Sequence, residues 1–148
     1  MILRIFKDGK LIAENKNTVV LQGVELIYYA LSGQILSSII LNYAELRLGD
    51  AQPEHVGLVY GTVTGVIKST TNQITYDYFQ NIQDKYGEIK TTITFVVQGT
   101  ESVQFNKVLL CHRESPADIR LFAYTFFPET QQIAPGTYIF EWTFRFNL

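Results

Sequence analysis

The stretch GTYIFEWTFRFNL (residues 136–148) carries a bulky apolar side chain on every second position. These side chains are Tyr138, Phe140, Trp142, Phe144, Phe146 and Leu148. The positions between them are polar, with Ile139 as the exception. A period of two belongs to a β-strand, whose successive side chains point to opposite faces of a sheet. We interpret the aromatic face as part of a core, because two sheets packed about 10 Å apart need large inward-pointing side chains.

The same period of two recurs along most of the chain that precedes this strand. The other segments that show it are 44–49, 58–68, 74–79, 88–98, 105–113 and 119–127. Clusters of Gly, Pro, Asn and Asp separate them. Short strands at such regular spacing predict an antiparallel sandwich or barrel.

The N-terminal stretch ILRIFKDGKLIAE (residues 2–14) predicts a β-hairpin. An Asp-Gly pair, Asp8 and Gly9, separates its two apolar runs, and this pair suits the positive φ angles of a tight hairpin turn. Two interpretations remain open for the hairpin: an arm that pairs with an adjacent subunit through its exposed edge, or a hairpin that closes its own sandwich. In the first case the interface residues would be Ile2, Ile5, Phe6, Leu11 and Ile12.

One helix is expected, over residues 18–32. Its apolar residues Leu21, Val24, Leu26, Ile27, Tyr28 and Leu31 recur at three- and four-residue spacing. Asn17 or Thr18 can cap its start, and Gly33 can end it in a left-handed conformation. Gly23 in the interior lowers helix propensity by about 1 kcal/mol relative to Ala, which indicates that another part of the chain packs closely there.

These elements predict a mainly β protein: an antiparallel, jelly-roll-like β-sandwich with an N-terminal β-hairpin and one short α-helix. A chain of 148 residues is long enough to bury roughly 70% of its unfolded surface in one core. We therefore expect residues 1–148 to form a single domain. It would contain the hairpin or arm (1–14), the helix (18–32) and the antiparallel strands (44–148).

The composition argues against several partner classes. The chain has 12 basic and 14 acidic residues and a net charge of −2, without a run of like charges, so we expect neither nucleic acid nor a membrane surface as a partner. Its apolar runs are far shorter than the ~20 residues of a membrane helix. The single cysteine, Cys111, and the lack of a signal-peptide pattern predict folding in a reducing cytoplasm.

The sequence offers no pattern typical of catalysis. His55 and His112 lie far apart, Cys111 and His112 are strand neighbours on opposite faces, and no group has zinc-ligand spacing. The charged stretch HRESPADIR (112–120) could form an acid/base site, but it also has the composition of an ordinary turn between strands, which we favour. Phosphate-binding glycine motifs are absent. We therefore predict no catalytic residue, no metal, no cofactor and no enzymatic activity.

The stretch YDYFQNIQDKYGE (76–88) is the strongest candidate for a binding surface. It predicts a polar loop with rigid aromatic residues at its edges, a mixture that is common at protein interfaces. The aromatic residues are Tyr76, Tyr78, Phe79 and Tyr86. The alternative is a hairpin whose aromatic side chains cover the edge of the sandwich.

Three stretches carry a resemblance to a known group of proteins: NTVVLQGVELIYYALSG (17–33), AELRLGDAQP (44–53) and the C-terminal segment 105–148. A capped helix with a central Gly precedes a short strand that ends in Gly and an acidic, Pro-containing loop. The last segment adds a strand, a loop, the strand LFAYTFF, a loop ending in Pro-Gly and the strand YIFEWTF. This order resembles small structural proteins of tailed bacteriophages.

The resemblance implies a non-enzymatic virion component, made in the host cytoplasm, that packs in many copies around a symmetric particle. Its partners would be itself, as a trimer or higher ring, and other virion proteins. One placement is the tail, baseplate or fibre-attachment region, and the alternative is a cement protein that decorates the capsid. A hypothesis of another class is a carbohydrate-binding β-sandwich, which would need Tyr76, Tyr78 and Tyr86 exposed in one plane to bind a glycan.

Overall fold

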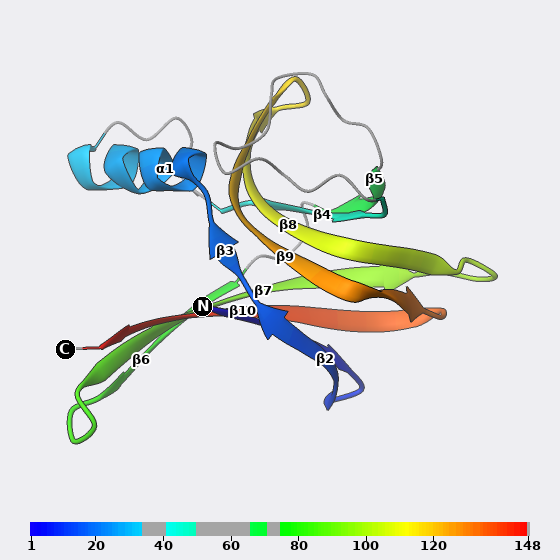
Figure 1. The fold of residues 1–148 in the computed structure, drawn as a ribbon, viewed down its shortest axis with the longest axis horizontal. Helices are drawn as coiled ribbons and strands as arrows, with labels where there is room; N and C mark the ends of the chain where they lie inside the picture. The colour runs from blue at the N-terminus through cyan, green and yellow to red at the C-terminus, as the bar shows by residue number, and fades with distance from the viewer. Residues whose placement is uncertain (34–40, 50–65, 71–74, 148) are drawn as a thin grey trace.

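The computed structural model describes residues 1–33, 41–49, 66–70 and 75–147. Within these ranges the chain forms one helix and two antiparallel sheets (Figure 1). The elements are β1 (Ile2–Lys7), β2 (Lys10–Lys16), β3 (Thr18–Val19), α1 (Leu21–Ser32), β4 (Tyr43–Arg47), β5 (Val66–Thr70), β6 (Thr75–Asn81), β7 (Tyr86–Val97), β8 (Val103–Ser115), β9 (Asp118–Ile133) and β10 (Gly136–Asn147). The predicted strands at 44–49, 74–79, 88–98, 105–113, 119–127 and 136–148 are confirmed with shifted ends.

Two five-stranded sheets face each other and form a sandwich, which confirms the predicted fold class. Sheet A has the order β2-β1-β10-β7-β6, and sheet B has the order β3-β9-β8-β4-β5. Early strands pair with late ones in a nested way: β1 with β10, β3 with β9, and β4 with β8. Both ends of the chain are therefore held by pairing with strands that are distant in sequence.

The C-terminal strand β10 is the central strand of sheet A, and its aromatic face points into the core. Trp142 has no exposed surface, and Tyr138 and Phe140 are also buried. The Phe140 ring lies 4.7 Å from the Phe95 ring of sheet A and 6.1 Å from the Phe105 ring of sheet B, measured between centroids. The aromatic alternation thus joins the two sheets, as its pattern predicted.

The N-terminal hairpin belongs to its own sandwich. Asp8 and Gly9 have the positive φ angles of 52° and 76° expected at its turn. Strand β1 pairs with β10, Ile5 is only 1% exposed within the core, and the Asn15 side chain on β2 donates a hydrogen bond to the Phe126 carbonyl of β9 at 2.9 Å. The hairpin thus closes its own sandwich, and Ile5 cannot serve as an interface residue because the core encloses it. Pairing of the exposed edge of β2 with an adjacent subunit stays a prediction.

The helix starts later than predicted, at Leu21. Val20 precedes it without a side-chain capping bond, whereas Thr18 lies in β3 and Asn17 accepts a hydrogen bond from the Thr125 hydroxyl at 3.0 Å. The predicted caps fail because sheet B uses both residues. The predicted end is confirmed, since Gly33 has a φ of 76° and its N–H donates to the Tyr29 carbonyl.

The helix is fixed to β9 through its first turn. The Val20 N–H donates to the Phe122 carbonyl at 3.1 Å, and the Gln22 side chain accepts the Leu121 N–H at 2.6 Å. A Cβ atom on Gly23 would lie 2.2 Å from the Phe122 carbonyl oxygen. This contact confirms the expectation of close packing at Gly23 and decides which side of the helix faces the sheet.

Some predicted features fall outside the described residues. They are His55, Leu148 and most of the predicted strand 58–68, of which only the end lies in β5.

The burial of β10 predicts different costs for two members of its aromatic face. We expect Trp142→Ala to lower the free energy of unfolding by about 3 to 5 kcal/mol, because it leaves a cavity between the sheets. Phe146→Ala, on the same strand and face but 58% exposed, should cost less than about 1 kcal/mol. Urea unfolding followed by far-UV circular dichroism measures both. Equal costs would contradict the described position of β10.

Two glycines provide a second, matched comparison. Gly23→Ala should destabilise the protein by about 1 to 3 kcal/mol despite the higher helix propensity of Ala, because its Cβ would meet the backbone of Phe122. At Gly87 the nearest atoms to an added Cβ lie at 3.9 Å, so Gly87→Ala should be neutral or stabilising. Thermal unfolding of both variants tests this. A neutral Gly23→Ala would show that α1 does not rest on β9 as described.

Candidate functional site

The helix turns an apolar face to the solvent. Five of its large side chains are between 42% and 85% exposed, and we call them the helix stripe: Leu21, Val24, Ile27, Tyr28 and Leu31. Only Gly23 and Leu26 of α1 are buried. The three- and four-residue spacing predicted the helix correctly, but most of the residues that make the pattern do not reach the core. A surface helix normally places this face inward.

The second exposed apolar surface lies where sheet A extends beyond sheet B. There the inward-facing side chains form rows across three strands, with Tyr78 on β6 opposite Ile89 on β7, and Ile89 opposite Phe144 on β10. Phe144 still packs on Phe122 of sheet B, at 5.6 Å between ring centroids. The next row holds Phe146, which is exposed. The aromatic face of β10 thus continues past the part of the core that covers it.

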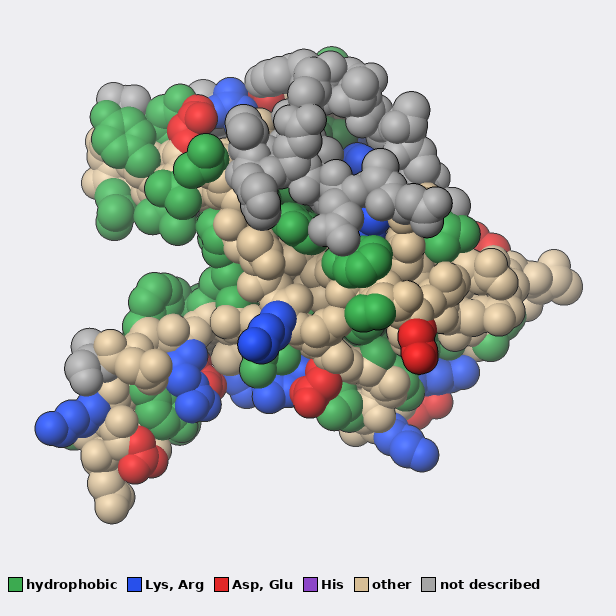
Figure 2. Space-filling view, in the orientation of Figure 1, with side chains coloured by type: hydrophobic (Ala, Val, Ile, Leu, Met, Phe, Trp, Pro, Cys, Tyr) green, Lys and Arg blue, Asp and Glu red, His purple; other side chains and the backbone are tan. Residues whose placement is uncertain are grey.

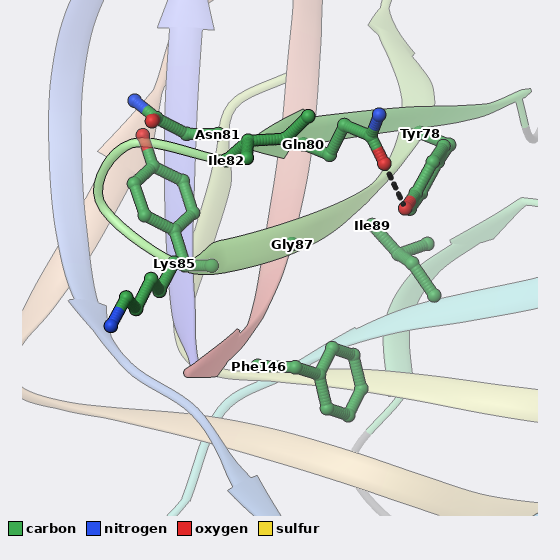
Figure 3. A pocket seen from close by; sticks show the side chains of 9 residues that line it. Tyr78, Gln80, Asn81, Ile82, Lys85, Gly87, Ile89 and Phe146 are labelled. Atoms are coloured by element: carbon green, nitrogen blue, oxygen red, sulfur yellow. Dashed lines mark hydrogen bonds between the residues drawn. The ribbon is translucent and has the colours of Figure 1, made fainter. Parts of the chain in front are cut away.

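A groove of about 560 Å³ opens at this projecting end of sheet A (Figure 3). Its lining residues are Tyr78, Gln80, Asn81, Ile82, Lys85, Tyr86, Gly87, Ile89 and Phe146. Gly87 lies between Gln80 and Phe146 in the strand register, and its missing side chain leaves space in that row. The Gln80 amide oxygen accepts a hydrogen bond from the Tyr78 hydroxyl at 3.1 Å. The groove is mostly apolar with a polar rim.

Figure 2 shows how the two apolar surfaces lie relative to each other. Hydrophobic side chains gather on α1 and on the projecting end of sheet A, and the molecular surface is hollowed between them. The helix stripe could not be recognised as a surface from the sequence, because apolar periodicity is the same whichever way a helix faces. Gly23 was the available signal, since close packing at one side of the helix places the opposite side in solvent.

The predicted polar loop at 76–88 is a β-hairpin made of β6 and β7. Its turn occupies residues 82–85, where the Asn81 side chain accepts the Asp84 N–H at 2.9 Å and Lys85 has a φ of 56°. The prediction of a loop is wrong, because the turn is short and the aromatic residues lie in the paired strands. The alternative interpretation, a hairpin at the edge of the sandwich, describes the structure.

The strand alternation separates the four predicted aromatic residues into two pairs. Tyr76 and Tyr78 point to the inward side of sheet A, whereas Phe79 and Tyr86 meet on the other side at 6.2 Å between ring centroids. There the Arg145 guanidinium lies 4.1 Å from the Tyr86 ring centroid. Tyr76, Tyr78 and Tyr86 therefore do not form the single exposed plane that the carbohydrate-binding hypothesis requires.

The remaining predicted interface residues lie on the N-terminal hairpin. Leu11 and Ile12 are exposed on β2, at one edge of sheet A, and Ile2 is exposed at the margin of β1. Phe6 is half-buried beside a bulge in the pairing of β1 with β2. Their role as an interface stays a prediction.

The charged stretch 112–120 contains the end of β8, the turn at Pro116 and Ala117, and the start of β9, so it joins two strands as predicted. His112 is buried and its Nε2 lies 2.9 Å from a Glu114 carboxylate oxygen, while Arg120 lies 3.3 Å from Asp118. Burial raises the pKa of the neighbouring Cys111 thiol well above its usual value, which keeps the thiol protonated. In the described ranges, no three His, Cys, Asp or Glu side chains lie close enough together to bind a metal ion.

No protein-family model, no curated protein and no solved structure matches this chain. Among its described residues, no helix is both long enough and apolar enough to cross a membrane.

Tyr76 connects β6 to the rest of the protein, and its titration is testable. Its hydroxyl donates a hydrogen bond to the Leu41 carbonyl, and burial raises the pKa of Tyr76 from 10.0 to about 12. Between pH 10 and 12 the folded state therefore keeps a proton that the unfolded state has lost. The free energy of unfolding must fall as the pH rises through this window.

We expect Tyr76→Phe to remove part of this pH dependence. Urea unfolding at several pH values between 10 and 12 should show the stability of the parent protein falling more steeply than that of the variant. Titration of tyrosinate absorbance should show one late-titrating tyrosine fewer in the variant. Parallel stability curves would mean that Tyr76 is not shielded in the fold.

Proposed function

We propose that the protein is a non-enzymatic structural protein of a tailed-phage virion. It assembles as a symmetric homo-oligomer in the tail, baseplate or fibre-attachment region. The resemblance of the helix and strand segments to small phage structural proteins motivates the placement. The observation that carries the proposal is the pair of apolar surfaces, the helix stripe and the groove at the projecting end of sheet A.

Apolar exposure on this scale supports an assembling subunit. The largest apolar patch of a typical monomer covers roughly 300 to 600 Å² and is often functional. The helix stripe alone contains five large exposed side chains, and the projecting end adds Tyr78, Ile82, Ile89 and Phe146. Scattered single exposed residues need no explanation, but two clustered surfaces on one small chain do.

The polar groups that could suggest catalysis have partners within the fold. His112 contacts Glu114, Arg120 contacts Asp118, and Arg145 donates to Glu88 at 2.8 Å. The Arg120 guanidinium also lies 3.8 Å from Glu25 of α1 and 5.8 Å from the Tyr29 ring centroid, so it ties the helix to the β8–β9 hairpin. These contacts are those expected of residues that stabilise a scaffold.

The proposal predicts the mass of the purified protein. Light scattering across a concentration series should give a discrete species of at least three copies of the 16.9 kDa chain. Negative-stain electron microscopy of that species should show a closed ring, because symmetric oligomers with head-to-tail contacts either close or grow into filaments. A strict monomer at every concentration would overturn the proposal.

A further inference from the structure

The two apolar surfaces differ in shape. The helix stripe is convex and runs along α1, while the end of sheet A is concave, because Gly87 leaves space between Gln80 and Phe146. The side chains of the convex helix stripe can therefore insert into a concave surface such as the groove. In Figure 2 both border the same hollow, yet the side chains of the helix stripe and those of the projecting end are exposed to solvent, so the two surfaces do not cover each other within the chain.

We propose that the groove at the projecting end of sheet A binds the helix stripe of a second copy of this chain. This inference rests on the proposed function and specifies the contact through which the subunits assemble. The contact is head-to-tail, because the helix stripe and the groove are different surfaces of the same molecule. Repetition of such a contact generates a ring if the rotation closes.

The area of the two surfaces fits a stable contact between subunits. With about 200 Å² for a large side chain, the exposed parts of the helix stripe amount to roughly 600 Å². Tyr78, Ile82, Ile89 and Phe146 at the projecting end expose roughly 500 Å² on the same basis. Burying both surfaces removes about 1,100 Å² in total, close to the lower limit of about 1,200 Å² for specific interfaces. A ring repeats this contact once for every subunit.

The charges of the two surfaces are complementary. Glu25 is the charged residue of α1, and Lys85 is the charged residue of the groove lining. Both are at the margin of an apolar surface, with Glu25 half-exposed beside Tyr29 and Lys85 in the β6–β7 turn. Opposite charges at the rim of an apolar contact favour the correct orientation more than they add affinity. The match favours a second copy over a partner of unrelated sequence.

Two variants remove the two halves of the contact separately. Leu31→Glu places a charge at the C-terminal end of the helix stripe, at its most exposed position (85%), so the fold should tolerate it. Gly87→Glu places a charge in the groove, where an added Cβ meets nothing closer than 3.9 Å. Each variant alone should associate at least about tenfold more weakly than the parent protein, because docking would bury an unpaired carboxylate.

Mixing the two variants tests the head-to-tail geometry. The Leu31→Glu chain keeps an intact groove, and the Gly87→Glu chain keeps an intact helix stripe. An equimolar mixture should therefore form a dimer of one copy of each and stop there, because the remaining groove and helix are both blocked. Analytical ultracentrifugation of each variant and of the mixture measures this. Variants that are monomeric alone and also in the mixture would overturn the head-to-tail contact.

A matched control separates a specific contact from a general effect of added charge. Val96→Glu introduces the same charge at a 44% exposed apolar position of β7, on the outward side of sheet A. It should leave the mass unchanged. Circular dichroism spectra and thermal unfolding of all three variants should match those of the parent protein, which shows that any loss of association does not come from unfolding.

The failure of this inference can be distinguished from the failure of the proposed function. A parent protein that is monomeric at all concentrations would overturn both. An oligomer that survives Leu31→Glu and Gly87→Glu would overturn the inference alone and place the contact elsewhere, for example at the exposed edge strand β6.

Discussion

The packing of the β10 aromatic face against sheet B is the interaction on which the rest of the structure depends. Phe140 contacts Phe95 within its own sheet and Phe105 across the sandwich, and Trp142 follows it in the same buried row. Because β10 is central in sheet A, its position also determines the registers of β1 and β7. The N-terminal hairpin is therefore held by the last strand of the chain, which explains why it closes the sandwich and does not extend as an arm.

The parts of the fold that depend on local backbone conformation could be predicted from the sequence. The turn at Asp8 and Gly9 and the helix end at Gly33 need positive φ angles, and only a few residue types adopt these readily. Strand alternation predicted the strands, since it depends only on which face is buried. The helix start could not be predicted in this way, because sheet B recruits Thr18 into β3 and uses the Asn17 side chain.

The candidate site was only partly predictable, for a different physical reason. Apolar periodicity shows which residues share a face, but it does not show what lies opposite that face. The helix stripe has the spacing of a core-facing helix, and Phe146 continues the core alternation of Trp142, yet both are exposed. The groove depends on Gly87, whose importance appears only when β6, β7 and β10 are in register. Tyr86 and Tyr78 are close in sequence but belong to opposite faces.

The two apolar surfaces have related structural causes. Sheet A extends beyond sheet B at this end, so residues that alternate inward emerge from the core while their pattern stays apolar. The helix packs on the backbone of Phe122 in β9 through Gly23, and the Phe122 ring packs on Phe144 at the base of the projecting end of sheet A. The contact at Gly23 turns the helix stripe away from the sheet. A chain that functions as a monomer gains nothing from large apolar side chains at Tyr78 and Leu31, because exposed apolar surface favours aggregation. Burial in a neighbouring subunit turns the same side chains into a contact that a regular assembly can repeat, and this physical advantage favours the assembling subunit.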